Sequence, residues 1–470
     1  MRAMGNLGEV SEWLGERLPQ LIEQHHVPAA GVAVLADGEV ADHVAGILNL
    51  RTGVEATTES VFQIGSVTKL WTSSLVLQLV DEGRVDLDAT VRTYLPGFRI
   101  RDEDAAAAIT VRQLLTHTSG FEGDIFTDTG VGDDCVEKLV DGLDDVPQLF
   151  APGSMWSYNN AGFVVLGRLV EVLRGKPYDA CLREHLVAPL GIAEAATDPY
   201  QAILFRAAAG HLGATDDEPQ RPAPHWALSR SNCPAGSMFA TSARGLLTFA
   251  RMHLEDGASA DGRQVLAPGT SARMQEAQVE LPSLGHFGDS WGLGFERFAR
   301  PDGLVVGHDG ATIGQYAFLR MVPDAGVAVA LLTNGGDAAA LYADLVGHVL
   351  GELTGVRPEA PPTPPADPRP VDATPYVGTY SCDVADLVVT QDGDGRVWLD
   401  ETPQGIAIEF GDVPTHTELV RLGADTLIAR EPDRGMHRVY AFLGTDAGPA
   451  TYLHTGRALP RNAGSGAMVR

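Results

Sequence analysis

A proline-rich stretch in the last third of the chain constrains the fold most, because it separates two parts of different character. Residues 356–374 contain seven prolines. Proline fixes the backbone angle φ and has no N–H to donate, so such a run forms a semi-extended linker rather than a helix or a central strand. A chain of 470 residues is long enough for two or three domains. We therefore predict a first domain at 1–355, a linker at 356–374 and a second domain at 375–470.

The part after the linker has the pattern of short strands with no helix between them. Apolar and β-branched runs recur every 8–12 residues or so, separated by turn residues such as Asp392-Gly393 and Asp446. Strands are predicted at 376–380, 386–390, 396–399, 406–410, 418–422, 426–430, 438–443 and 451–454. Eight sequential strands of this kind predict a small up-and-down β-barrel.

The part before the linker mixes helix and strand signals. Helical spacing of apolar residues predicts a helix over 7–26, followed by strands at 29–35 and 40–47 around the turn at Asp37-Gly38. Further strands are predicted at 60–64, 305–310, 315–321 and 327–333, with a closing helix at 338–353 and a mainly helical lobe over about 86–295. Strands from both ends of this part are expected to share one sheet. The predicted fold class is α/β, with helices flanking the sheet and an inserted helical lobe.

Composition excludes several classes of partner and cofactor. The formal charge of −28 disfavours nucleic acid and anionic membrane surfaces. The cysteines Cys135, Cys181, Cys233 and Cys382 are scattered, and no Cys/His group has the spacing of a zinc site. We therefore expect neither a metal nor another cofactor. The N-terminal sequence lacks the apolar core of a signal peptide, and no run of about 18 apolar residues occurs, so a cytoplasmic protein is expected.

The motif SVTK places Ser66 and Lys69 three residues apart at a predicted helix start, on one face of that helix. A serine hydroxyl is a weak nucleophile and needs a neighbouring base. Lysine can be that base when burial or nearby cations lower its pKa, which arginine does not permit. The chain has only three lysines, and a bare S-x-x-K also arises by chance. The alternative interpretation of Lys69 is an exposed helix lysine.

A second candidate segment is Tyr158-Asn159-Asn160. A tyrosine beside the serine and lysine can share their proton as a phenolate, or protonate a leaving group. The side-chain amide of Asn160 suits a substrate peptide group. The alternative is a helix N-terminus with asparagine caps.

The third candidate segment is His308-Asp309-Gly310, at the end of a predicted strand. The small residue Gly310 lets a substrate backbone lie against that strand. The N–H groups of Ala311 and Ser66 can together form an oxyanion hole. His308 is interpreted as a residue that orients the tyrosine or binds a carboxylate, and the alternative is an ordinary exposed turn.

In this order and at these separations, SVTK at 66–69, YNN at 158–160 and HDG at 308–310 resemble the motifs of the serine β-lactamase and penicillin-binding-protein superfamily. The resemblance extends over roughly residues 10–350 and includes LLTHTSG at 114–120. It implies an acyl-enzyme on Ser66, with Lys69 and Tyr158 as the base and acid pair. No E-x-x-L-N segment is present, so the chain is most similar to the class C and DD-peptidase-like branch. Its third motif begins with His308, which is typical of peptidases, esterases and acyl-transfer enzymes rather than of β-lactamases.

A domain of this kind followed by a proline-rich linker and a lipocalin-like barrel is similar to penicillin-binding-protein-type thioesterases, which release and macrocyclise nonribosomal peptides. This resemblance implies a peptidyl thioester on a carrier protein as substrate and partner. It also implies a D-residue at the acyl end, attack by Ser66 and head-to-tail release by the peptide's own amine. Arg457 and Arg461 are candidate peptide contacts, with solvated tail arginines as the alternative.

Three other hypotheses use the same residues. The first is a D-aminopeptidase, DD-peptidase or esterase, in which water attacks the acyl-enzyme. The second is a β-lactamase. The third is an inactive relative that only binds peptides, which the complete set of Ser66, Lys69, Tyr158 and His308 disfavours. The sequence predicts neither the peptide nor the oligomeric state.

Overall fold

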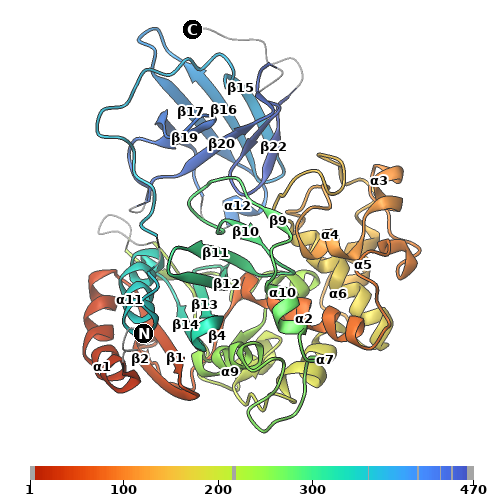
Figure 1. Ribbon diagram of the computed structural model, residues 1–470, viewed down its shortest axis with the longest axis vertical. Coiled ribbons are helices and arrows are strands. Elements are labelled where there is room, and N and C mark those ends of the chain that lie inside the picture. Colours follow the sequence, from red (N-terminus) through yellow and green to blue (C-terminus); the bar gives the residue numbers. More distant parts are fainter. Residues whose placement is uncertain are drawn as a thin grey trace.

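The computed structural model describes residues 6–213, 219–357, 359–409, 412–433, 436–445 and 448–462. Its first part is organised around an antiparallel sheet with the order β3-β2-β1-β14-β13-β12-β11-β10-β9 (Figure 1). The strands are β1 Ala29–Ala36, β2 Glu39–Asn49, β3 Val54–Glu55, β9 Val279–Glu280, β10 Ser290–Trp291, β11 Glu296–Arg300, β12 Gly303–Thr312, β13 Gln315–Val322 and β14 Val327–Thr333. Strands from both ends of this part therefore share one sheet, as the sequence predicts.

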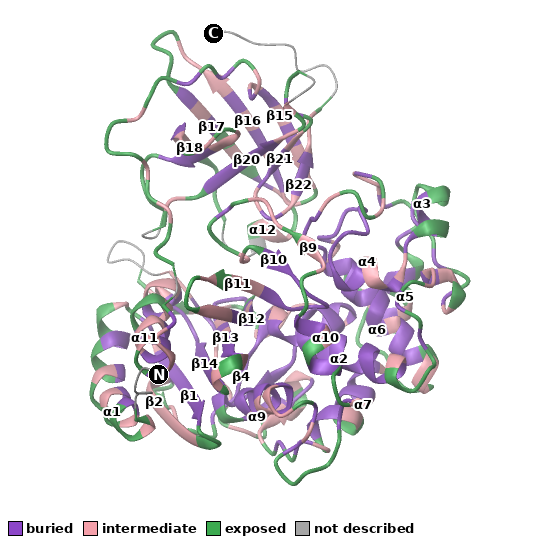
Figure 2. Ribbon diagram, viewed as in Figure 1, coloured by how far each residue is buried: buried purple, intermediate pink, exposed green. Residues whose placement is uncertain are grey.

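Helices cover both faces of this sheet, and so its neighbouring strands β1 and β14 are buried throughout. All eight residues of β1 are buried. Val32 and Val34 pack with α1 (Leu7–Gln24) and α11 (Ala338–Thr354) in one cluster, whereas Ala33 belongs to the larger cluster on the opposite face, with α9 (Ala243–Leu254). Figure 2 shows these central strands buried and the outer sides of α1 and α11 exposed. The alternation of side chains along a strand explains this division.

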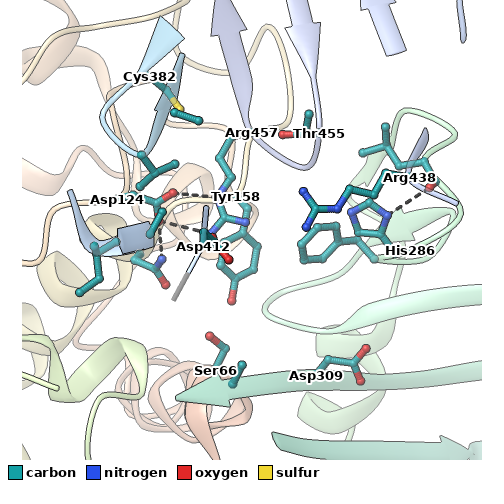
Figure 3. Close-up of a pocket in the computed structure, with 18 of the residues that line it drawn as sticks. Ser66, Asp124, Tyr158, His286, Asp309, Cys382, Asp412, Arg438, Thr455 and Arg457 are labelled. Carbon is teal, nitrogen blue, oxygen red and sulfur yellow. Dashed lines mark hydrogen bonds and ion pairs between the residues drawn. The ribbon is translucent and has the colours of Figure 1, made fainter. Parts of the chain in front are cut away.

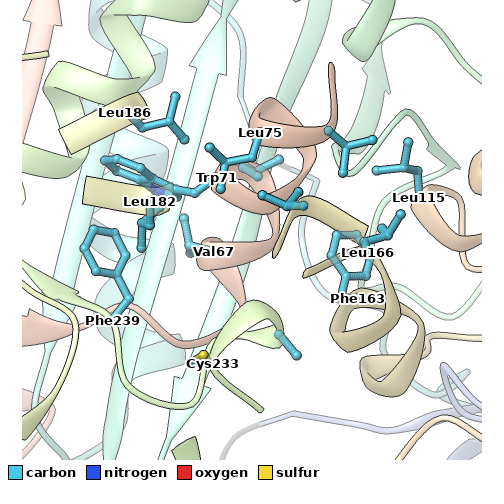
Figure 4. Packing of buried hydrophobic residues seen from close by; sticks show 14 of the residues in the cluster. Val67, Trp71, Leu75, Leu115, Phe163, Leu166, Leu182, Leu186, Cys233 and Phe239 are labelled. Carbon is cyan, nitrogen blue, oxygen red and sulfur yellow. The ribbon is translucent and has the colours of Figure 1, made fainter. Parts of the chain in front are cut away.

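The helical lobe is centred on α2 (Thr68–Asp81), which is buried on all sides over most of its length. Trp71 stacks on Phe249 with ring centroids 4.0 Å apart. Figure 4 shows Trp71 beside Phe239, and these two rings meet edge to face. The other helices of the lobe are α3 Glu103–Ala108, α4 Val111–Leu115, α5 Cys135–Asp141, α6 Asn160–Arg174, α7 Tyr178–Leu182, α8 Pro199–Ala202 and α10 Thr270–Gln275. Because α2 cannot shift without disturbing this core, it is a rigid support for the residues at its start.

The strand predicted at 60–64 is shorter than expected and does not join the main sheet. It is β4 (Phe62–Gln63), which pairs with β8 (Ala240–Thr241), and β8 also pairs with β5 (Ala195–Ala196). A separate hairpin joins β6 (His211–Leu212) to β7 (Arg221–Pro222). The helix predicted to open at Ser66 begins at Thr68 instead, after the 3₁₀ turn Gly65–Val67.

The part after the linker is a nearly closed antiparallel barrel in which β15 to β22 follow one another in sequence order. The strands are β15 Gly378–Cys382, β16 Ala385–Gln391, β17 Val397–Pro403, β18 Thr415–Arg421, β19 Thr426–Ala429, β20 Val439–Leu443, β21 Tyr452–His454 and β22 Ala458–Pro460. A bridge between Tyr380 and Arg461 brings the last strand back to the first. The up-and-down topology predicted from the sequence is therefore confirmed.

One predicted barrel strand is wrong. Of the segment 406–410, Ile406–Glu409 is the short helix α12, and Phe410 lies outside the described residues. Gly405 has a φ of 52°, in the left-handed region, and turns the chain out of β17. The strand that completes the barrel is β22, which the sequence analysis did not predict. Short apolar runs do not distinguish a strand from a helix by periodicity.

Candidate active site

Ser66 lies where three backbone segments approach so closely that only glycine fits between them. A methyl group added to Gly310 would lie 2.0 Å from the carbonyl oxygen of Ile64 and 2.9 Å from the nitrogen of Ser66. A methyl group on Gly236 would lie 2.1 Å from the carbonyl oxygen of Gly65. Gly65 and Gly236 also have φ values of 50° and 113°, which disfavour other residues. The turn that carries the nucleophile is thus fixed from both sides.

The N–H of Ala311 faces this turn. Thr312 and Gln315 flank the two-residue turn between β12 and β13, and such a flanking pair is hydrogen-bonded. The preceding pair, Ala311 and Tyr316, is therefore of the non-hydrogen-bonded kind, and its N–H groups face away from the partner strand. A methyl group on Gly65 would lie 2.5 Å from the nitrogen of Ala311. The structure thus brings together the two predicted oxyanion-hole residues.

Lys69 is completely buried, with contacts that suit a neutral amine. Its Nζ lies 2.7 Å from Asn160 Oδ1, 2.7 Å from the carbonyl oxygen of Ala235 and 3.0 Å from Ser66 Oγ. A neutral amine has two N–H donors and one lone pair. The two carbonyl groups accept both hydrogens, so the lone pair remains for the serine O–H. Burial, with a further effect from Arg457, lowers the pKa of Lys69 well below its ordinary value. The interpretation of Lys69 as an exposed helix lysine is therefore wrong.

Tyr158 is a neutral phenol that faces the nucleophile. Its side chain is buried, and burial raises its pKa well above the ordinary value of 10. Figure 3 shows the phenol oxygen pointing toward Ser66. Lys69 Nζ lies 4.9 Å from the centre of the ring. The resting phenolate considered in the sequence analysis is thus disfavoured, and the side chain is suited to donate a proton.

Asn160 connects the lysine to a partly buried ion pair. Its Nδ2 donates to Asp124 Oδ1 over 2.6 Å, and Arg457 Nε donates to Asp124 Oδ2 over 2.8 Å. Burial opposes the charge of Arg457, but the carboxylate of Asp124 outweighs it and raises the pKa of the guanidinium. The neighbouring Asn159 caps helix α6 by accepting from the N–H of Gly162, so the capping interpretation holds for Asn159 but not for Asn160.

Arg457 comes from the barrel, whose turn between β21 and β22 holds the segment that carries Tyr158. The carbonyl oxygen of Gly456 accepts from the N–H of Tyr158 over 3.0 Å, and the guanidinium of Arg457 lies 4.9 Å from the tyrosine ring centre. The N–H of Ala458 donates to Ser157 Oγ over 3.0 Å. Arg457 is therefore not a solvated tail residue, and the barrel is part of the site.

Arg461, the other candidate from this segment, is placed differently. It donates to the carbonyl oxygen of Val377 inside the barrel, and its guanidinium lies 5.9 Å from the ring centre of Tyr380. These contacts join the two ends of the barrel rather than reaching the active site.

His308 is buried and neutral. Burial, with a smaller effect from Lys69, lowers its pKa to about 3. Its Nδ1 donates to the carbonyl oxygen of Asp309 over 2.5 Å, and its Nε2 has no hydrogen-bond partner within the described structure. The ring centre lies 6.2 Å from that of Tyr158. His308 therefore contacts the tyrosine through its ring and offers a free lone pair. It does not carry the positive charge needed to pair with a carboxylate.

His117, in the segment LLTHTSG, is a functional candidate to which the sequence analysis assigned no role. Its ring stacks on Tyr158 with centroids 4.3 Å apart, and its Nδ1 accepts from the N–H of Asn159 over 2.9 Å. Its carbonyl oxygen accepts from the N–H of Ser157 over 2.9 Å. Its φ of 55° lies in the left-handed region, which is uncommon for residues other than glycine. A strained, fully buried residue that contacts three consecutive residues around the tyrosine is a positioning residue.

Two substitutions separate the contributions of His117. Asparagine tolerates the left-handed conformation and keeps an acceptor near the Nδ1 position, whereas phenylalanine keeps the ring but loses the acceptor. We expect His117→Phe to lower kcat by roughly 10- to 100-fold with little change in KM, because the tyrosine is displaced. His117→Asn should recover most of this loss. Equal losses in both variants, with melting temperatures unchanged, would contradict the positioning role.

A cavity of about 670 Å³ lies over Ser66 and is shared by both parts of the chain (Figure 3). Its walls are mostly apolar and include Phe126, Leu284, Phe287, Pro361, Pro362, Leu387, Val439, Tyr440 and Leu459. Ser66, Tyr158, Asn160, Gly310, Ala311 and Arg457 all line it. Lys69 lies behind Ser66, outside the lining.

Across the described ranges, no group of three His, Cys, Asp or Glu side chains is placed to hold a metal ion. No helix in these ranges is long and apolar enough to cross a membrane.

A buried acid, Glu122, lies where the barrel meets the helical lobe. Its Oε1 accepts from the N–H of Gly123 over 2.9 Å, and its Oε2 accepts from the N–H of Asp383 of the barrel over 3.4 Å. Burial, and then the nearby carboxylates of Asp124 and Asp383, raise its pKa from 4.5 to about 7. Burial and then Asp124 also raise the pKa of Asp383, and Arg101 offsets this rise in part. At neutral pH the joint between the two parts is therefore close to gaining a buried negative charge.

This predicts a pH-dependent stability. A carboxyl whose pKa is raised by folding stabilises the protein below its unfolded pKa of 4.5, and this contribution is lost as the pH rises through about 7. The shift corresponds to about 3 kcal/mol at most. We expect the melting temperature of wild-type protein to fall between pH 5 and pH 8 by several degrees more than that of Glu122→Gln, whose side chain stays neutral. An identical fall in both proteins would show that Glu122 does not control the joint.

Comparison with known proteins agrees with this geometry. A family model described as Beta-lactamase matches residues 14–351. Penicillin-binding protein 4 of Amycolatopsis lactamdurans is 45% identical over 367 residues, which are 78% of this chain and 96% of that protein. Esterase EstB of Burkholderia gladioli is 32% identical over 188 residues, 37% of this chain and 48% of the esterase.

Solved structures extend the likeness beyond the linker. The crystal structure of SurE covers 97% of this chain and 100% of its own, with a TM-score of 0.79 and 30% identity. The match to the octameric penicillin-binding protein homologue from Pyrococcus abyssi covers 94% of this chain and 97% of that one, with a TM-score of 0.63. At 20% identity it shows a likeness of fold alone. The chain therefore belongs to the β-lactamase and penicillin-binding-protein family and is a serine hydrolase or acyltransferase that works through an acyl-enzyme.

Proposed function

We propose that the protein is a penicillin-binding-protein-type thioesterase that takes a peptidyl group from a carrier-protein thioester onto Ser66 and releases it as a head-to-tail macrocycle. The observation that carries this proposal is the cavity over Ser66, whose far side is formed by the barrel and the proline-rich linker. Its volume of about 670 Å³ and its mostly apolar walls suit a folded-back peptide rather than a single amino acid. Partial exclusion of water favours an amine over water as acceptor. The proposal includes a cytoplasmic location, where the carrier protein is the partner.

In the first step, Ser66 Oγ attacks the thioester carbonyl carbon while its proton passes to Lys69 Nζ, 3.0 Å away. The negative charge that forms on the carbonyl oxygen is stabilised by the N–H groups of Ser66 and Ala311. The C–S bond then breaks, and Tyr158 donates its proton to the departing sulfur, since burial keeps this side chain protonated. Tyr158 regains a proton from Lys69. The products are a free thiol and an ester on Ser66.

In the second step, the amino group of the bound peptide attacks the ester carbonyl. The amine loses a proton to Lys69, the C–O bond to Ser66 breaks, and Lys69 returns that proton to the serine oxygen, 3.0 Å away. Asn160 Nδ2 is occupied by Asp124, and Asn160 Oδ1 by Lys69, so in this structure Asn160 holds the base rather than a substrate amide. The net change is one thioester and one amine converted into one lactam and one thiol, without water.

A D-configured residue at the acyl end is part of the proposal. One solved structure of SurE, with 30% sequence identity and a TM-score of 0.76, contains D-Leu. This supports recognition of a D-residue in a site of the same architecture. Gly310 has no side chain, so the 64–66 turn packs directly against β12 and places Ser66 beside that strand.

The test is a synthetic peptidyl thioester ending in a D-residue, with products followed by mass spectrometry. The proposal predicts a product lighter than the linear acid by one water. A matched substrate ending in the L-enantiomer should be turned over much more slowly. Linear acid as the sole product from several D-terminated peptides would overturn the cyclase proposal, while the acyl-enzyme chemistry would stand.

Hydrolysis is the second candidate function, favoured by the 45% identity to a protein named penicillin-binding protein 4. On this hypothesis a penicillin, a D-amino-acid amide or a simple ester acylates Ser66, and water releases the product. A fluorescent penicillin separates the candidates when it is offered together with the peptidyl thioester. Fast turnover of the penicillin or of the amide, with slow thiol release from the thioester, would favour hydrolysis over macrocyclisation.

A further inference from the structure

The cavity over Ser66 continues into the open end of the barrel. Leu387 of β16, Glu401 of β17 and Tyr440 of β20 line this end of the cavity. Leu399, two residues before Glu401, belongs to the barrel core, so Glu401 is on the inner face of β17. We call the surface formed by Leu387, Glu401 and Tyr440 the barrel mouth. It places a carboxylate beside the side chains of Leu387 and Tyr440.

Glu401 is less neutralised than the other carboxylates that line the cavity. Asp124 accepts from Arg457 over 2.8 Å, and Asp309 lies 2.6 Å from a guanidinium nitrogen of Arg320. Asp412 is exposed and therefore solvated. The contact of Glu401 with Arg438 is long, at 3.4 Å.

Arg438 is divided between two acids. Another of its nitrogens lies 3.2 Å from Asp433, and half of its side chain is exposed. Burial raises the pKa of Glu401, and Arg438 offsets this only in part, while Asp412 and Asp433 add to the rise. The inner wall of the barrel mouth therefore carries a partly desolvated carboxylate that a shared arginine, 3.4 Å away, neutralises only in part. A second cation arriving from the cavity would be attracted to it.

The proposed substrate supplies such a cation. The amino end of a peptide has a pKa of about 7.7–8.0 and is mainly protonated at neutral pH. Its ammonium group has three N–H donors, which suit a carboxylate acceptor. When the other end of the peptide is bonded to Ser66, the chain runs through the same cavity that Glu401 lines.

We infer that the barrel mouth is a binding site for the amino-terminal ammonium of the acyl chain, with the Glu401 carboxylate as its counter-ion. The identity of the ligand rests on the proposed function. The site collects the amino end inside the cavity before the ring closes. The amine leaves Glu401 and loses its proton to water before it attacks the ester, so the site acts through binding and not through bond formation.

The test uses two D-terminated peptidyl thioesters that differ only at the amino end, one free and one acetylated. Release of the thiol reports acylation of Ser66, which does not require the amine to attack. At substrate concentrations below KM, we expect the wild-type protein to prefer the free amine about tenfold in kcat/KM, the size of one charged hydrogen bond. The preference should shrink as salt is added.

Glu401→Gln keeps the shape of the side chain and removes its charge, so it should abolish the preference. Asp400→Asn is the matched control. Asp400 precedes Glu401 on β17, its side chain is half exposed, and it pairs with His416 over 2.6 Å on the outside of the barrel. This variant should keep the preference. No preference in wild-type protein, or an unchanged preference in Glu401→Gln, would overturn the inference. A preference accompanied only by linear product would overturn the macrocyclase proposal and leave the ammonium site standing.

Discussion

Replacing Lys69 by arginine or methionine is expected to lower the rate of acyl-enzyme formation by about 10³-fold. Arginine stays protonated and cannot accept the serine proton, and methionine has no base at all. The two carbonyl groups that flank Lys69 accept hydrogen bonds but cannot take a proton themselves. The measurement is thiol release from a peptidyl thioester under single-turnover conditions.

The control for this prediction is Lys176→Arg. Lys176 is half exposed and pairs with Glu184, so the exchange should leave both rate and melting temperature unchanged. The pH profile provides a further check. Because the pKa of Lys69 is lowered well below its ordinary value, wild-type acylation should rise with pH through that lowered pKa, and so at a lower pH than for an exposed lysine. A Lys69→Met variant with more than a tenth of the wild-type rate would exclude Lys69 as the base.

Replacing Gly310 by alanine is expected to lower kcat/KM by about 10²- to 10³-fold, the range seen when one oxyanion-hole donor is lost. The added methyl group would lie 2.0 Å from the carbonyl oxygen of Ile64 and 2.9 Å from the nitrogen of Ser66. Both neighbours are backbone atoms and cannot rotate aside. The 64–66 turn must therefore move away from β12, which separates the N–H of Ser66 from that of Ala311. We also expect a fall of several degrees in melting temperature.

Gly393→Ala is the matched control, because a methyl group there would meet nothing within 4 Å. It should leave activity and stability unchanged. Adding a methyl group to Gly310 without loss of acylation would show that the backbone at 310 does not fix the oxyanion hole. A loss of stability with normal kcat/KM in the folded fraction would point to the same conclusion.

Three short motifs predict the reacting residues of the site, but they do not predict the residues that hold those side chains in place. Ser66, Lys69 and Tyr158 lie in motifs that together are typical of nucleophilic catalysis. The structure brings these three residues together. Asp124 and His117 could not be predicted in this way. An isolated aspartate or a histidine in a loop has no pattern of its own, and its role depends on contacts made only in the folded chain. The position of Arg457 over Tyr158 likewise depends on how the barrel packs against the first part.

The fold shows the same division between local and long-range information. Alternating apolar residues predicted most barrel strands, because one face of each strand packs inside. The segment 406–410 has similar alternation, but Ile406–Glu409 follows the left-handed turn at Gly405 and folds as α12. The closing strand, Ala458–Pro460, is three residues long, too short for any periodicity to appear. Its pairing is determined by closure of the barrel rather than by its own sequence.

The most direct test of the central claim is the mass of the intact protein shortly after mixing with a D-terminated peptidyl thioester, followed by proteolysis to locate the adduct. The acyl group should appear as an added mass on the peptide that contains Ser66. The adduct should then disappear as cyclic product forms, and Ser66→Ala should show no adduct at any time. An adduct on another residue, or cyclic product formed at an unchanged rate by Ser66→Ala, would contradict the account.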